Sequence, residues 1–214
     1  MWGSVNFSNN IPQLKKLKEH VRISLASLYD ALAHKEYCEW KKYHISSKLV
    51  STETLLDKAN TFTTPTYARL LLKAICLFHN RRQIDSAIRE IRKCSKINDP
   101  CWKYSLAFLH AYKGNLNYAQ RFYKQAFAGE LPQGQLLDIE IFIQDILEKE
   151  PDKKQLYFCL GLINYQMKLD LQSAEKYFTN FLIACADNEK YQKQLFEAKN
   201  ILDNIQTFVT EICE

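Results

Sequence analysis

The stretch from residue 100 to residue 127 constrains the fold more than any other part of the chain. It contains two segments with the apolar spacing of amphipathic helices, and Gly114 and Asn115 mark a turn between them. Small and large apolar residues stand together in both segments, at Leu106, Ala107, Ala119, Tyr123, Ala126 and Phe127. Because neither helix can bury its apolar face alone, the stretch predicts a helical hairpin that packs against further hairpins.

The composition favours helices throughout the chain. Only five of the 214 residues are glycine, too few for a protein rich in tight β-hairpins. Proline at the first position of a helix loses no hydrogen bond. All five prolines stand where helical periodicity begins: Pro12, Pro65, Pro100, Pro132 and Pro151. We therefore predict an all-α chain.

Helical periods of apolar residues also organise the N-terminal region, residues 1–64. They predict helices over 12–34, 36–49 and 52–60. The first of these helices has a single apolar face, made by Leu14, Leu17, Val21, Leu25, Leu28 and Leu32. The lysines of this segment fall away from that face.

Three segments of the remaining chain share the hairpin pattern, at about 65–99, 100–131 and 154–187. Small residues stand at closely similar places in them, namely Ala87, Ala107, Ala119, Gly161 and Ala174. This pattern resembles the tetratricopeptide repeat (TPR), a helical hairpin with a period of about 34 residues. The first helix of the third segment is one residue longer than the pattern requires.

The resemblance implies that residues 65–214 form a right-handed α-solenoid of TPR-like hairpins. An inserted helix over 135–149 interrupts the repeats, and a helix over 189–212 is expected to cap the C-terminal end. The N-terminal region matches no repeat clearly.

In TPR proteins the first helix of each repeat lines a concave groove that binds a peptide or helix. Transferred to this sequence, the resemblance implies partner-binding positions at His79, Tyr104, Phe108, Tyr112, Phe158 and Tyr165. An aromatic groove with little charge suits an apolar segment of a partner. The alternative is that the inserted helix closes the groove, and these aromatic residues are then part of the core.

The function expected from this resemblance is protein–protein interaction, as an adaptor, chaperone or regulatory scaffold. An alternative is nucleic-acid binding, because residues 1–100 carry 17 Lys or Arg and only 9 Asp or Glu. The candidate basic patch for that function comprises Arg81, Arg82, Arg89, Arg92, Lys93 and Lys96. A solvated helix face is the simpler explanation of this patch, since no aromatic residues alternate with the charges.

A third alternative, an enzyme, has no motif to support it. The sequence contains no phosphate-binding loop and no GxSxG or HExxH motif, so we predict a non-enzymatic protein without a cofactor. The seven cysteines form no CxxC pair, and no apolar run approaches the roughly 20 residues of a membrane span. We therefore expect no metal site, no membrane span and a cytoplasmic location.

Overall fold

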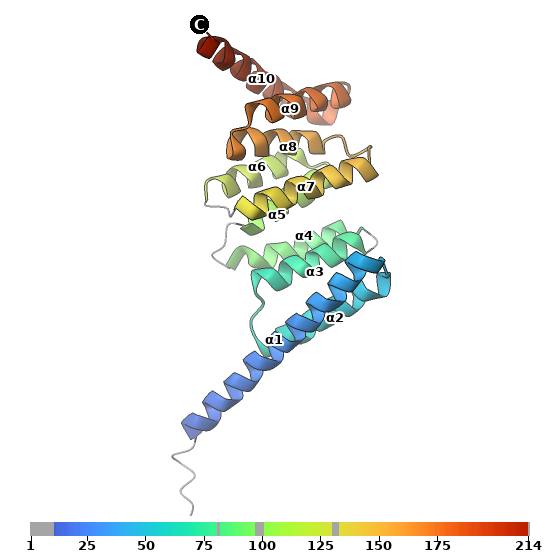
Figure 1. Ribbon diagram of the computed structural model, residues 1–214, viewed down its shortest axis with the longest axis vertical. Helices are drawn as coiled ribbons and strands as arrows, with labels where there is room; N and C mark the ends of the chain where they lie inside the picture. Colours follow the sequence, from blue (N-terminus) through green and yellow to red (C-terminus); the bar gives the residue numbers. More distant parts are fainter. Residues whose placement is uncertain (1–10, 81, 97–100, 130–132, 214) are drawn as a thin grey trace, which may run out of the picture. The chain divides into compact units, whose positions relative to one another are not determined.

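The computed structural model describes residues 11–80, 82–96, 101–129 and 133–213 (Figure 1). Every regular element within these ranges is a helix, which confirms the all-α prediction for the described part of the chain. The chain divides into two compact units, Met1–Ile97 and Asn98–Glu214. A continuous solenoid across the two units stays a prediction.

The first unit contains four α-helices among its described residues. They are α1 (Ile11–Tyr43), α2 (Ser46–Phe62), α3 (Tyr67–His79) and α4 (Ile84–Arg92), and a short 3₁₀ helix (Lys93–Lys96) follows α4. Each α-helix packs on the next one in the chain. The pair α3/α4, which the sequence assigned to the repeats after residue 64, therefore lies in the same compact unit as the N-terminal helices.

The predicted break between residues 34 and 36 is wrong, because α1 continues unbroken for 33 residues. The chain has no glycine or proline between Pro12 and Pro65, so nothing forces the helix to end there. The helix ends instead before His44, which adopts a left-handed conformation with φ 54°. The two predicted helices over 36–49 and 52–60 are accordingly replaced by the end of α1 and by a longer α2.

A buried arginine joins α1 to α3 within the first unit. The guanidinium of Arg69 donates two hydrogen bonds to the carboxylate of Asp30, at 2.7 and 2.8 Å. Arg69 also donates to the hydroxyl of Thr63 at 2.7 Å. The planar guanidinium matches the carboxylate in this two-point geometry, so the contact fixes the orientation of both helices.

The second unit contains two helical hairpins and two further helices. The hairpins are α5/α6 (Cys101–Tyr112 and Leu116–Phe127) and α8/α9 (Leu156–Ile163 and Leu171–Cys185). Helix α7 (Gln133–Lys149) packs on α8, and α10 (Gln192–Cys213) packs on α9 (Figure 1). Helices α5 and α6 also contact α8, so the two hairpins share one core.

A π-helical turn, Asn164–Lys168, follows α8 directly. Such turns accommodate one extra residue in a helix, and the sequence places one extra residue in this segment. The turn is tied to α7 because Asn164 and Lys168 both donate to the carboxylate of Glu140, at 3.2 and 2.8 Å. The irregular turn and the inserted helix thus stabilise each other.

Helices α8 and α9 approach each other closely at Gly161. A Cβ atom added to Gly161 would stand 2.6 Å from the ring of Phe178, which is fully buried. Only glycine fits at this position of α8, because the Phe178 ring occupies the space that any side chain would need. The small-residue pattern of the sequence therefore corresponds here to a real steric requirement.

We predict that Gly161→Ala lowers the free energy of unfolding by about 1–3 kcal/mol, because it overpacks the α8–α9 interface. Gly→Ala inside an unobstructed helix has the opposite sign and stabilises by about 0.5–1 kcal/mol. Thermal and urea denaturation of the purified wild type and variant measure the sign of the change in unfolding free energy. Phe178→Leu in the same chain should recover part of the loss, whereas a stabilised Gly161→Ala protein would contradict the packing described.

Candidate functional site

The aromatic residues predicted to line a groove are mostly core residues. Tyr104 and Phe158 are completely buried, and Phe108 and Tyr112 are buried as well. The ring of Phe108 packs on Phe142 of α7, with 5.3 Å between the ring centroids. The expectation that these four side chains form an exposed surface is therefore wrong, and helix α7 covers Phe108 as the alternative interpretation foresaw.

The other two predicted groove residues are half-buried. Tyr165 stands in the π-helical turn of the second unit. His79 belongs to the first unit, where its ring lies 4.6 Å from the ring of Trp40 in α1. The structure thus places one of the six residues on a contact between two helices of the first unit and the other five in the second unit.

Tyr104 is an example of an aromatic side chain packed entirely within the core. Its ring meets Tyr123 edge-on, with 5.6 Å between the centroids. Burial raises the pKa of the Tyr104 hydroxyl well above its usual value. Among the described residues, this hydroxyl has no hydrogen-bond partner. An unsatisfied buried hydroxyl costs free energy, so it contributes nothing to the stability of this core.

This geometry predicts opposite results for two substitutions at one position. Tyr104→Phe removes the unsatisfied hydroxyl, so the unfolding free energy should stay unchanged or rise by up to about 1 kcal/mol. Tyr104→Ala leaves a large cavity and should cost about 3–5 kcal/mol. Urea denaturation of both variants separates the effects of the hydroxyl and the ring. A fully stable Tyr104→Ala protein would mean that the ring lies outside the core.

The candidate basic patch is only partly available for binding. Arg81 lies outside the described residues, and Lys96 stands in the 3₁₀ helix with its side chain not described. Of the exposed members, Lys93 pairs with Glu90 at 2.7 Å and Arg89 donates to Ser86 at 2.8 Å.

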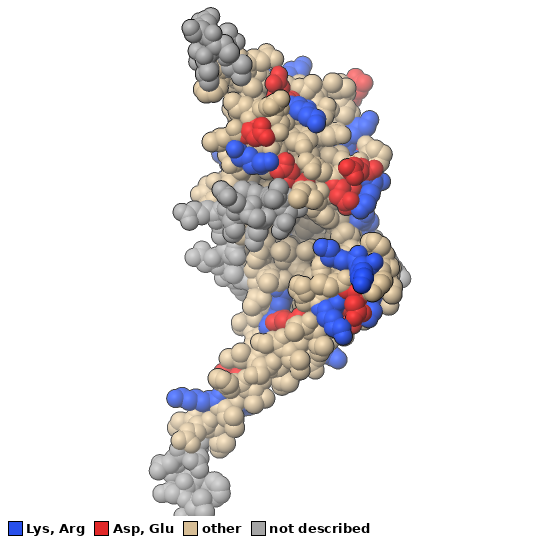
Figure 2. Space-filling model, viewed as in Figure 1, with Lys and Arg blue, Asp and Glu red and all other residues tan. Residues whose placement is uncertain are grey.

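The two remaining members of the basic patch differ in their surroundings. Arg92 is exposed on α4, and the guanidinium of Arg82 lies over the Phe78 ring, 4.7 Å from its centroid. The viewed face of the molecule in Figure 2 shows acidic and basic side chains interspersed. On α4 the arginines of the patch share the helix with Asp85 and Glu90, so the patch is a mixed-charge helix surface rather than a continuous basic stripe.

The most exposed apolar surface of the first unit lies on α1. We call it the α1 stripe, and it consists of Leu14, Leu17, Val21, Leu25, Leu28 and Leu32. Leu25 is half-buried, and the other five side chains are between 40% and 61% exposed. The sequence identifies these residues as one helix face, but periodicity alone does not tell which neighbour covers that face.

The α1 stripe is separate from the face by which α1 joins the core. The fully buried residues of α1 are Ala26 and Ala33, and the backbone carbonyl of Ala33 accepts a hydrogen bond from Thr52 of α2. With about 3.6 residues per turn, the stripe lies roughly 130° around the helix axis from these two alanines. Helix α1 therefore has an alanine face toward α2 and a leucine-rich face toward solvent.

Helix length explains why much of α1 has no neighbour within its unit. Helix α2 has 17 residues against the 33 of α1. Phe62, the last residue of α2, stacks on Tyr29 with 5.7 Å between the ring centroids. The side chains from residue 12 to residue 24 are all exposed, and Figure 1 shows this part of α1 extending past the end of α2.

Basic residues accompany the α1 stripe along its first half. Residues 12–25 contain four Lys or Arg and one Glu, a formal net charge of +3. Three of them, Lys15, Lys18 and Arg22, fall at steps of three and four and form a row beside the stripe, which we call the basic row. Arg22 pairs with Glu19 at 3.3 Å, with both side chains about half exposed.

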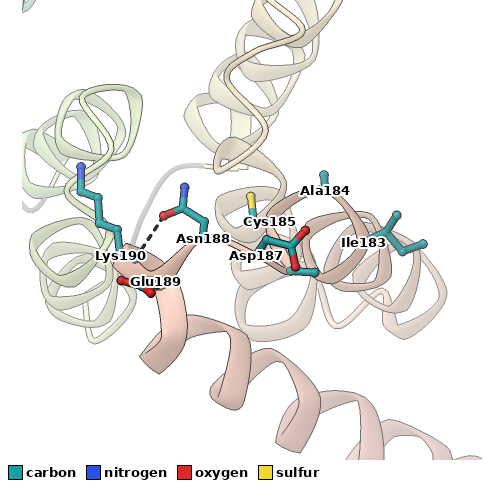
Figure 3. Close-up of a pocket in the computed structure, with 8 residues that line it drawn as sticks. Ile183, Ala184, Cys185, Asp187, Asn188, Glu189 and Lys190 are labelled. Atoms are coloured by element: carbon teal, nitrogen blue, oxygen red, sulfur yellow. Dashed lines mark hydrogen bonds between the residues drawn. The ribbon is translucent and has the colours of Figure 1, made fainter.

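Two hollows of the described surface lie in the second unit, and neither is lined by a row of large apolar side chains. One, of about 410 Å³, is lined by a single continuous stretch from Ile183 to Lys190 at the turn between α9 and α10 (Figure 3). In this turn the side-chain oxygen of Asn188 accepts a hydrogen bond from the backbone N–H of Lys190. Burial raises the pKa of the Cys185 thiol on its wall, which keeps the thiol protonated and unreactive.

Burial raises the pKa of several cysteine and tyrosine side chains in the two units, which favours their neutral forms. Burial raises the pKa of the Cys76 thiol, and that of the Cys159 thiol, to about 12. A nucleophilic cysteine needs the opposite shift. Across the described residues, no group of three or more His, Cys, Asp or Glu side chains is arranged to hold a metal ion.

Within the described part of the chain, no helix combines the length and apolar character needed to cross a membrane. In comparisons with known proteins, no family model matches the chain, and no curated protein is significantly similar to it. We therefore infer the function from the physical properties of the surface.

Proposed function

We propose that this protein is a protein-interaction module and that the α1 stripe is its binding surface for a helix of a partner. One observation carries the proposal: five large aliphatic side chains share one exposed face of a helix whose other face packs on its neighbours from Ala26 onward. A row of half-exposed leucines in water costs free energy that burial against a partner recovers. Contiguous apolar surfaces of this kind mark interaction sites on soluble proteins.

The shape of the surface favours a helical partner. The α1 stripe runs about 27 Å from Leu14 to Leu32, at a rise of about 1.5 Å per residue. Its side chains recur at steps of three and four, which is the spacing that an amphipathic partner helix presents in return. The interaction function expected from the sequence is thus kept, while its location moves from the buried aromatic residues to α1.

Nucleic-acid binding is less well supported as the function. The candidate basic patch includes the ion pair of Lys93 with Glu90, and its arginines share the helix with acidic residues. The roles of adaptor, chaperone and regulatory scaffold all require a binding surface, and the α1 stripe supplies one for each of them.

We predict that the double variant Leu17→Gln/Leu28→Gln folds normally and loses its partner. Glutamine keeps the helix propensity of leucine, and both positions are exposed, so the unfolding free energy should change by less than about 0.5 kcal/mol. The matched control is Ile183→Gln, an exposed aliphatic side chain on α9, in the second unit.

The experiment is affinity capture from the native host with the wild type and both variants, followed by calorimetry with the purified captured protein. A protein that binds the wild type and the Ile183→Gln control, and loses at least about tenfold in affinity for the double variant, supports the proposal. Equal binding of that protein to all three chains would place the interaction elsewhere and refute the role of the α1 stripe.

A further inference from the structure

The basic row places positive charge along one flank of the α1 stripe. Lys15, Lys18 and Arg22 are all exposed and lie along one flank of the stripe. On the opposite flank the corresponding positions carry no Lys, Arg, Asp or Glu: they are His20, Ser24, Ser27 and Ala31. Lys16 lies further around the helix, so most of the positive charge beside the stripe is on one flank.

We propose that the partner segment is an acidic amphipathic helix, with leucine-like side chains facing the α1 stripe and carboxylates facing the basic row. This inference rests on the proposed function and adds the chemical class of the partner. Its charge complements the +3 of residues 12–25, and its apolar face covers the leucines that no described part of the first unit covers.

Charge also distinguishes this partner from a second copy of the same chain. Two copies of α1 in parallel would bring two segments of charge +3 together. In an antiparallel pair, residues 12–25 would face residues from the second half of α1, and residues 26–43 contain three basic and three acidic residues. Those acidic residues are Asp30, Glu36 and Glu39, and they already pair with Arg69 and Lys48 within the first unit. Neither arrangement therefore gives the basic row carboxylates without a partner of their own.

The Arg22–Glu19 contact does not prevent such pairing. Both side chains are about half exposed, and the pair joins residues one helical turn apart. Exposed pairs of this kind contribute little to stability. A partner carboxylate beside the stripe, shielded from water by the surrounding apolar contacts, competes effectively for the guanidinium of Arg22.

Two synthetic peptides of about three heptads test the proposal directly. The acidic peptide carries Leu at the a and d positions and Glu at the e and g positions, and the basic peptide carries Lys in place of every Glu. Like charges at e and g keep each peptide from pairing with itself. Fluorescence anisotropy with the full chain measures both affinities at low and at high salt.

The acidic peptide should bind the wild type at least about tenfold more tightly than the basic peptide at low salt. The difference should shrink at about 1 M salt, where the screening length falls to about 3 Å. Leu17→Gln/Leu28→Gln should weaken the acidic peptide at least about tenfold. The preference for the acidic peptide should disappear in the triple variant Lys15→Gln/Lys18→Gln/Arg22→Gln. The matched control is Arg89→Gln/Arg92→Gln/Lys93→Gln, which removes the same charge away from α1. This control should keep the preference.

Other outcomes separate this inference from the proposed function. Equal binding of both peptides, lost in the Leu17→Gln/Leu28→Gln chain, would overturn the acidic preference and leave the α1 stripe as a binding surface. Binding of neither peptide would overturn the inference. A dimer of the wild type in sedimentation equilibrium, lost in the Leu17→Gln/Leu28→Gln chain, would also overturn the inference. The stripe would then be an interface between two copies.

Discussion

A helix buries only the faces that its neighbours cover, and α1 has its packed neighbours on one face. Ala26 and Ala33 allow the backbone of α2 to approach, and the Arg69–Asp30 contact fixes α3 against the same helix. The leucine-rich face points elsewhere, so the core of the first unit forms without it. This arrangement gives the unit stability from one side of α1 and leaves the other side for binding.

In the second unit the same principle leaves the expected aromatic groove filled. Helix α7 brings Phe142 onto Phe108, and its Glu140 holds the π-helical turn that follows α8. The hydroxyl of Tyr104 has no hydrogen-bond partner among the described residues, so this residue contributes to the interior through its ring. Phe108, which the TPR resemblance assigned to a groove, is here covered by helix α7 of the same chain.

The sequence predicted the helical hairpins well because the information is local. Gly114 marks the α5–α6 turn with φ 78°, and the small residue Gly161 marks the close approach to Phe178. The prediction of where α1 ends was wrong because no glycine or proline marks the end of this long helix. The exposure of Leu17 and Leu28 could not be predicted from the periodicity, because periodicity defines a helix face but not the neighbour that covers it. The one available signal was length, because the unbroken apolar period from Leu14 to Leu32 is longer than either of the helices predicted after it, over 36–49 and 52–60.

The central claim is that the leucines of the α1 stripe lie outside the core, and hydroxyl-radical footprinting read by mass spectrometry tests it most directly. The method compares the side-chain oxidation rates of Leu17 and Leu28 with those of Leu49 and Leu56 of α2, which are fully buried. Leu17 and Leu28 should react in the native protein nearly as fast as in the urea-unfolded chain, while Leu49 and Leu56 are strongly protected. Equal protection of all four leucines would show that the α1 stripe is already buried, and the account of α1 as a binding surface would be wrong.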